Sequence, residues 1–122
     1  MSRVIHFELP ADNPERAVDF YKKVFGWQFQ KWQGPTDYWL ISTGPDAQPG
    51  INGGLLRRQQ PGAGTCNTIS VTSLDGSVAT VAKHGGKNVV PKMAIPGVGY
   101  VAYCSDTEGN VFGLLEPDAN AH

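Results

Sequence analysis

The sequence predicts an α+β protein built from two copies of one βαβββ module. The first observation is an internal repeat, because a gap-free shift of 60 residues aligns Val18 with Val78 and Gly26 with Gly86. The second is that each half shows the same order of patterns: a strand-like run, an amphipathic helix and three further strand-like runs. The third is frequent punctuation by 15 Gly and 9 Pro. We therefore expect one domain over 1–122, with module 1 at 3–57, a linker at 58–65 and module 2 at 66–117.

Module 1 is expected to begin with a strand at 4–9, where apolar and polar residues alternate. Asn13 then has the character of an N-cap, and Pro14 suits the first helical position. An apolar stripe running from Ala17 to Phe25 predicts an amphipathic helix of three turns that ends at Gly26. Three strand-like runs follow at 27–32, 38–43 and 51–56.

Module 2 repeats this order from residue 66 onward. A strand is expected at 66–71, followed by a helix that is capped by Ser73 and stopped by Gly85 and Gly86. Further strands are expected at 88–92, 98–104 and 111–116, with a hairpin turn at 106–109. Segments 50–57 and 109–116 align at a shift of 59, Gly on Gly and Leu-Leu on Leu-Leu, which is the strongest evidence for duplication.

One helix can cover only one face of a four-stranded sheet. The other face must be buried by a partner sheet, a ligand or another chain, so function is expected there. His6 and Glu8 lie two residues apart in the first strand and therefore point to this uncovered face, about 6–7 Å apart at a rise of about 3.3 Å per residue.

The charge pattern excludes several classes of partner. The net charge is −1 and no polybasic run is present, so binding to nucleic acid or to a membrane surface is not expected.

Neither a transmembrane run nor an apolar leader is evident, which predicts a cytoplasmic protein. Cys66 and Cys104 are then expected to be free thiols. Arg57 and Arg58, at the end of a strand, are expected to be solvated.

Several motifs resemble the vicinal oxygen chelate superfamily, which includes glyoxalases, bleomycin resistance proteins and extradiol dioxygenases. Residues 6–10 (HFELP) and 12–17 (DNPERA) resemble its opening, and residues 96–99 (PGVG) and 106–110 (DTEGN) resemble its close. The resemblance covers roughly residues 3–117. It implies paired βαβββ modules that form an eight-stranded curved sheet, with a ligand in the cup. The two modules can pair within one chain or between the chains of a dimer.

In members with a metal, the resemblance places one ligand on each first strand and one on each last strand. These positions fall on His6, on Cys66 (or Asn67 in a register off by one), on Gly54 and on Gly113. Glycine has no side chain that could coordinate an ion, and a divalent site needs three or four donors. We therefore expect no cofactor and no metal, with His6 as the only inherited ligand; a divalent metal is the alternative.

The site residues expected from this pattern form a floor that suits a ligand with a polar end and an apolar body. They are His6, Glu8, Asn52, Gly54, Cys66, Thr68 and Gly113.

His6 and Glu8 are the candidate catalytic pair, a base with an orienting carboxylate; the structural alternative is a buried histidine satisfied by a polar neighbour. Cys66 could be a nucleophile or a small buried hydrophobe. Aromatic residues could wall the site, but the sequence leaves open whether Tyr38 or Trp39, and Tyr100 or Tyr103, faces inward.

The sequence thus predicts a protein that binds a small organic molecule without a metal and forms a homodimer. The alternative is a glyoxalase-like lyase or isomerase, or a dioxygenase, in which His6 serves as metal ligand or base. A third interpretation is an interaction module that uses the open face only to dimerise.

Overall fold

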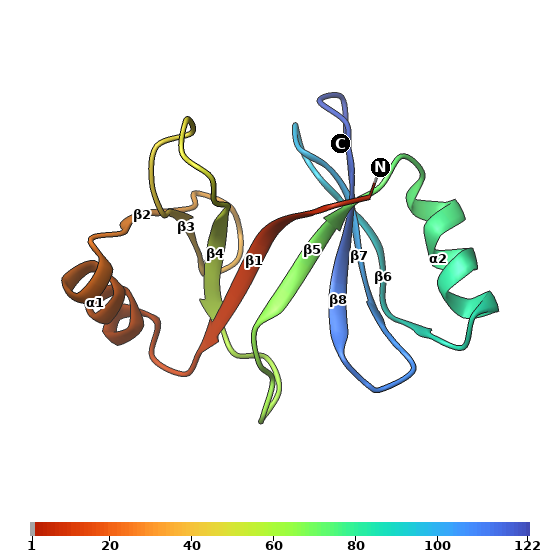
Figure 1. The fold of residues 1–122 in the computed structure, drawn as a ribbon, viewed down its shortest axis with the longest axis horizontal. Helices are drawn as coiled ribbons and strands as arrows, with labels where there is room; N and C mark the ends of the chain where they lie inside the picture. The colour runs from red at the N-terminus through yellow and green to blue at the C-terminus, as the bar shows by residue number, and fades with distance from the viewer. Residues whose placement is uncertain (1) are drawn as a thin grey trace. The chain divides into compact units, whose positions relative to one another are not determined.

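The computed structural model describes residues 2–122, which divide into two compact units. One unit comprises 6–65, and the other comprises 66–122 together with the start of the chain up to Ile5. In the latter unit the carbonyl oxygen of Arg3 accepts a 2.9 Å hydrogen bond from the amide of Ser70. We use module 1 for the elements β1–β4 with α1, and module 2 for β5–β8 with α2 (Figure 1).

Module 1 follows the predicted order of elements. These are β1 (Val4–Ala11), α1 (Pro14–Phe25), β2 (Gln28–Lys31), β3 (Tyr38–Ser42) and β4 (Asn52–Arg57). The strands lie in the order β2-β3-β4-β1, with β1 parallel to β4 and β3 antiparallel to β4. This register sets His6 opposite Asn52 and Glu8 opposite Gly54.

Helix α1 begins and ends at the predicted residues. The Asn13 side chain accepts a 3.1 Å hydrogen bond from the Arg16 amide, and Gly26 ends the helix with a φ of 71°. Ala17 and Val18 pack against the core of this module, which consists of Ala11, Trp39, Ile41 and Leu55.

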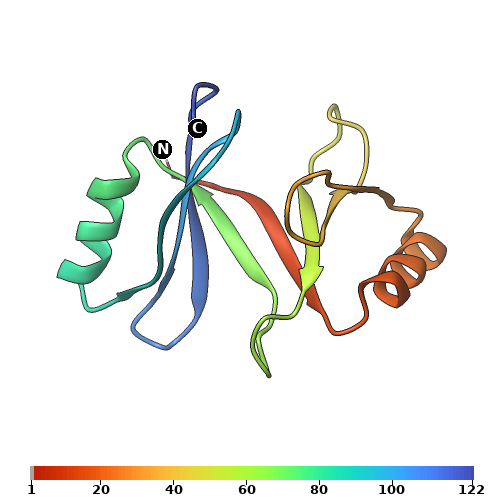
Figure 2. The same ribbon diagram turned by 180° about the vertical axis from the view of Figure 1, so that it is seen from behind.

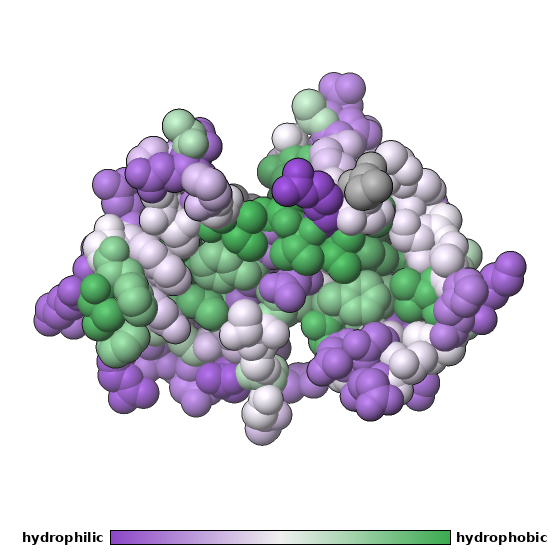
Figure 3. Space-filling view, in the orientation of Figure 1, coloured by the Kyte–Doolittle hydropathy of each residue, from purple (hydrophilic) through white to green (hydrophobic). Residues whose placement is uncertain are grey.

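The apolar stripe of α1 is wider than the surface that the sheet covers. Phe20, Val24 and Phe25 are more than half exposed, and they form the apolar surface over α1 at the left of Figure 3. Tyr21 stacks on Trp27 at 5.1 Å between ring centroids, so a row of aromatic rings continues from the exposed side of the helix toward the core.

Module 2 repeats the architecture, as seen from behind in Figure 2. Its elements are β5 (Cys66–Ser70), α2 (Leu74–Lys83), β6 (Lys87–Ile95), β7 (Gly99–Ser105) and β8 (Val111–Pro117). The strands lie in the order β5-β8-β7-β6, with β5 parallel to β8. The core contains Val71, Leu74, Ala102, Cys104 and Leu114. The predicted fold class, α+β with two βαβββ modules, is confirmed.

Strand β6 continues beyond Lys92, where the sequence pattern ends it. It contains Pro91, and its pairing with β7 shifts register between Asn88 and Val90 and again between Val90 and Met93. A proline cannot donate to a ladder, but an edge strand with bulges tolerates it.

The two modules use different hydrogen bonds to attach the end of the last strand to the residues at the start of the helix. In module 2 the Glu116 carboxylate at the end of β8 accepts a 2.7 Å hydrogen bond from the Leu74 amide, which is the first amide of α2. In module 1 the matching position is Arg57, whose guanidinium donates a 3.2 Å hydrogen bond to the Asp12 carbonyl just before α1. Both contacts attach the final strand to the start of the helix.

No helix in the span 2–122 has the length and apolar character needed to cross a membrane.

Candidate functional site

The face of the module 1 sheet that lies away from α1 carries the residues of interest, and we call it the open face of module 1. Trp39 is buried beside Leu55 in the helix-side core. Because successive side chains of a strand alternate between faces, Tyr38 points to the open face. His6 and Glu8 from β1, and Gly54 from β4, share that face.

A hydrogen-bonded network joins three side chains of the open face. The hydroxyl of Tyr38 donates a 2.9 Å hydrogen bond to Glu8 Oε2. The hydroxyl oxygen of Tyr38 also lies 2.9 Å from His6 Nε2. Glu8 is only 8% exposed, so its hydrogen bond to the phenol offsets part of the cost of burying a polar group. The phenol of Tyr38 therefore bridges the histidine and the carboxylate that the sequence pairs.

Gly54 makes room for this bridge. A Cβ atom at position 54 would lie 1.8 Å from the Tyr38 hydroxyl oxygen and 2.1 Å from its Cζ. The end of the phenol thus occupies the volume that any side chain of residue 54 would need. The glycine on β4 and the tyrosine on β3 are a complementary pair.

The connection between β2 and β3 holds Tyr38 in place. The Trp32 amide donates a 2.8 Å hydrogen bond to the Tyr38 carbonyl. The Trp32 ring also meets the Tyr38 ring edge to face at 6.4 Å, a favourable aromatic geometry. Backbone and ring contacts together fix where the hydroxyl lies.

Burial lowers the pKa of His6 below its ordinary value of 6.5, and the charge of Glu8 partly opposes this by raising it. Removal from water disfavours the imidazolium more than the nearby carboxylate favours it. The neutral imidazole is therefore the favoured form near neutral pH.

The donors of module 1 do not fit the divalent ion that the superfamily resemblance implies. Position 54 carries no donor, the Tyr38 phenol fills its space, and the Nε2 atom of His6 is engaged by that phenol. Within residues 2–122, no cluster of three or more His, Cys, Asp or Glu side chains could hold a metal ion. A divalent cation needs three or four such donors around one point.

Asn52 pairs with His6 in the register of β1 and β4, but its side chain makes a separate, structural contact. Its side-chain oxygen accepts a 3.0 Å hydrogen bond from the Thr43 amide. The Thr43 hydroxyl in turn donates to the Ile51 carbonyl at 2.7 Å. Asn52 thus closes the β3–β4 connection.

Module 2 places its predicted residues on the corresponding face of its own sheet. Thr68 is buried and lies opposite Gly113, and a Cβ at Gly113 would lie 3.1 Å from the Thr68 hydroxyl oxygen. Tyr103 borders Gly113 on this face, whereas Tyr100 packs against the helix-side core.

The two cysteines differ in burial. Cys66 is half-buried, with its thiol 3.7 Å from the Asn67 carbonyl, and Cys104 is fully buried. Neither is part of a disulfide. The buried position of Cys104 gives it the packing role of a small hydrophobe.

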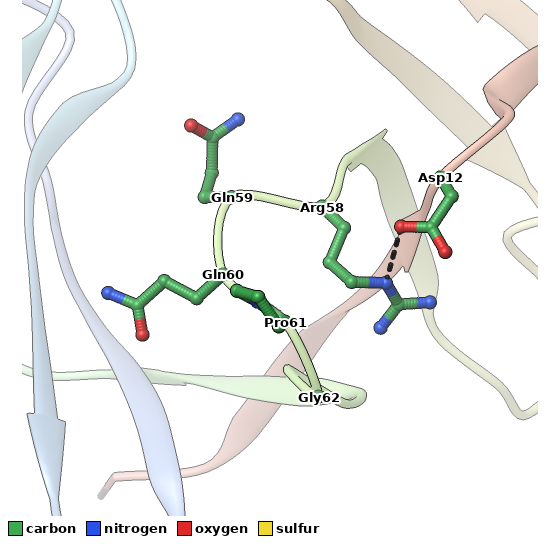
Figure 4. A pocket seen from close by; sticks show the side chains of 6 residues that line it. All are labelled: Asp12, Arg58, Gln59, Gln60, Pro61 and Gly62. Atoms are coloured by element: carbon green, nitrogen blue, oxygen red, sulfur yellow. Dashed lines mark hydrogen bonds and ion pairs between the residues drawn. The ribbon is translucent and has the colours of Figure 1, made fainter.

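A shallow pocket lies along the linker, away from the network (Figure 4). Arg58 points toward Asp12 and pairs with it at 3.0 Å, and it also donates to the Ala63 carbonyl. The expectation that Arg58 is a solvated residue is therefore wrong, because its contacts hold the linker. Gln59 and Gln60 point away from it, so no set of polar groups converges in this pocket.

The sequence predicted Tyr38 only as one of two residues, with Trp39, that could face inward as part of an aromatic wall. It did not predict that Tyr38 joins His6 and Glu8. A signal was present, since a glycine inside a strand leaves a volume that a neighbouring side chain must fill. What the sequence lacked was the parity of β3, which decides whether Tyr38 or Trp39 supplies that side chain.

Comparisons with known proteins bear on the family and the fold of this chain. Residues 3–44 match a family model described as bleomycin resistance protein-like N-terminal. A glyoxylase-like domain-containing protein of Didymella fabae is 32% identical over 114 residues, covering 88% of this chain and 88% of that protein. CFP32 of Mycobacterium bovis is 30% identical over 114 residues, but the chain spans only 42% of its length.

Solved structures share the fold at low sequence identity. The hypothetical protein BH1468 of Bacillus halodurans matches with a TM-score of 0.72 at 15% identity, covering 99% of this chain and 98% of that one. A methylmalonyl-CoA epimerase in complex with methylmalonyl-CoA and NH4+ matches with a TM-score of 0.71 at 13% identity and the same coverage.

Proposed function

This chain belongs to the vicinal oxygen chelate superfamily, and from that premise we propose that it binds a small organic molecule without the superfamily's metal ion. The ligand would lie on the open face of module 1. The observation that carries the proposal is the Tyr38 phenol, which stands above Gly54 and engages both His6 and Glu8.

The open face offers a polar end and an apolar flank. His6, Tyr38 and Glu8 supply the polar end. Leu40 lies two residues after Tyr38 on the same face, directly opposite Gly54, and is 44% exposed. Trp32 adds an aromatic surface beside Tyr38. A ligand with one polar group and an apolar body would satisfy both parts.

Metal analysis tests the proposal directly. Protein purified without chelator, then titrated with Ni²⁺, Zn²⁺ and Fe²⁺, should hold no ion in stoichiometric amount. A Tyr38→Ala/Gly54→Glu variant is the matched comparison, because it removes the phenol and restores a carboxylate at position 54. One tightly held ion per unmodified chain would contradict the metal-free proposal.

Binding itself is tested by native mass spectrometry and by unassigned density in a crystal grown without added ligand. A bound small molecule beside His6 supports the proposal. Replacement of His6 by Ala should weaken binding of that molecule by about 0.5–1.5 kcal/mol, the worth of one hydrogen bond. An open face filled only by the protein's own side chains would favour the interaction-module interpretation.

The second candidate is a glyoxalase-like lyase or isomerase, or a dioxygenase, with His6 as base or metal ligand. Its support is the Didymella fabae relative, whose name is glyoxylase-like, together with a neutral imidazole beside a phenol and a carboxylate. Loss of turnover of an identified substrate in the His6→Ala variant would favour this candidate over a passive binding protein.

We also propose a homodimer in the cytoplasm. The exposed apolar residues Phe20, Val24 and Phe25 and two cysteines outside any disulfide support these expectations. Sedimentation equilibrium should give twice the mass of one chain, and a single-chain mass over the whole concentration range would contradict the dimer.

A further inference from the structure

We propose that Tyr38 fixes the neutral His6 imidazole in the tautomer with its proton on Nε2, and thereby presents Nδ1 to the ligand as a hydrogen-bond acceptor. Tyr38 is then a positioning residue, and His6 makes the contact. The tautomer follows from the network alone. The ligand contact rests on the proposed function.

The direction of the hydrogen bonds decides the tautomer. The phenol of Tyr38 donates its proton to Glu8 Oε2, 2.9 Å away, where a carboxylate oxygen accepts it. A phenol has one proton, and once that proton is donated its oxygen can only accept from other groups. The His6 Nε2 atom, 2.9 Å from the same oxygen, must therefore carry the proton of their shared hydrogen bond.

The second ring nitrogen of His6 is left available. Nδ1 has no hydrogen-bond partner within residues 2–122. Every buried side-chain nitrogen or oxygen atom in this span has a partner. An atom without a partner must therefore reach solvent, so Nδ1 lies at the surface with its lone pair unused.

This arrangement selects one class of ligand group. A neutral imidazole whose Nε2 is already committed accepts at Nδ1, and so it favours a hydroxyl, an amine or an amide N–H over a carboxylate or a phosphate. The lowered pKa of His6, caused chiefly by burial, supports the neutral form. The open face is therefore suited to the donor group of an alcohol, a phenol or an amide.

Long-range ¹H–¹⁵N correlation spectra of ¹⁵N-histidine-labelled protein, recorded at mildly alkaline pH without ligand, test the tautomer. His6→Gln identifies the His6 signals by their loss. We expect His6 to show the pattern of the pure Nε2–H form, whereas exposed His84 shows a mixture of tautomers. A dominant Nδ1–H pattern for His6 would overturn the proposal, whether or not any small molecule binds.

Two variants test the role of Tyr38. Tyr38→Phe keeps the ring and loses the hydroxyl, so the His6 pattern should relax to the mixture shown by His84. Glu8→Gln supplies an amide that can donate to the phenol, so part of the His6 population should shift toward Nδ1–H. Native dispersion of the backbone amide spectrum confirms that each variant is folded. An unchanged His6 pattern in both variants would overturn the role assigned to Tyr38.

A matched pair of probes tests the acceptor. Phenol and anisole present the same ring, but only phenol donates a hydrogen bond. Phenol should shift the Nδ1 resonance of His6, and anisole should leave it unchanged. Equal shifts with both probes, or none, would overturn the acceptor role. The proposed metal-free function fails separately, through stoichiometric metal binding, so the two failures are distinguishable.

Discussion

Replacement of Gly54 by alanine tests the packing of Tyr38 over the last strand of module 1. The added Cβ would lie 1.8 Å from the phenol oxygen and 2.1 Å from Cζ, far inside van der Waals contact. The Tyr38 ring must therefore leave its place between His6 and Glu8. Glu8, which is 8% exposed, would then lose the phenol as a donor.

The expected cost follows from two contributions. A hydrogen bond to a charged group is worth about 1.5–3 kcal/mol. Forcing an extra methyl group into a filled space typically costs about 1–3 kcal/mol. Partial relaxation of the exposed side of the site reduces the sum, so we expect Gly54→Ala to lower the free energy of unfolding by about 2–4 kcal/mol.

Two comparisons isolate the role of Tyr38. Gly113→Ala, the matched change in module 2, meets the Thr68 hydroxyl at 3.1 Å and the Tyr103 ring at 3.4 Å, neither of them a severe overlap, and should cost less than about 1 kcal/mol. A Tyr38→Ala background removes the three atoms that would lie nearest to the Cβ of residue 54, all of them in the phenol, so Gly54→Ala should be neutral or stabilising by about 0.4–1 kcal/mol, because alanine restricts the unfolded chain.

Urea unfolding measures these differences, with Trp fluorescence for module 1 and far-ultraviolet circular dichroism for the whole chain. All three tryptophans, Trp27, Trp32 and Trp39, lie in module 1. If Gly54→Ala destabilises the protein equally with and without Tyr38, the packing argument is refuted.

Three further changes have defined outcomes. Because folding lowers the pKa of His6 below 6.5, the stability that depends on the neutral imidazole is complete above pH 6.5 and is lost as the pH falls below that value. The urea midpoint should therefore fall with decreasing pH over this range in the unmodified protein and not in His6→Gln. Asn13→Ala should cost about 1 kcal/mol in urea unfolding, and Asn13→Ser should restore most of it. Arg58→Ala should speed amide hydrogen exchange across 59–65 and leave exchange in α2 unchanged.

Both helix starts and the end of α1 could be predicted to the residue because they carry local signals, whereas α2 ends at Lys83, ahead of the Gly85 and Gly86 that the pattern predicts as its stop. Asn13 and Ser73 each accept a backbone amide three residues on, and Gly26 adopts the left-handed conformation that stops α1. These interactions join residues close in sequence, so short motifs reveal them.

The candidate site could be predicted only in part, because its contacts span long sequence distances. His6 and Glu8 were found from the alternation of one strand, whereas Tyr38 lies 32 and 30 residues away from them. The run 38–43 is apolar on both faces, since Trp39 and Ile41 alternate with Leu40. Only the packing of Trp39 into the core resolves that parity.

The hydrogen bonds that attach the ends of β4 and β8 to the helix starts have opposite polarity, and this restricts how the two modules can be recombined. A carboxylate at position 116 captures a helix-start amide, while a guanidinium at position 57 captures a carbonyl. A chimera that exchanged these closing strands would set acceptor against acceptor and donor against donor. The two closing strands are therefore not interchangeable in these contacts, and a chimera that moves one of them should move it together with the helix start that it contacts.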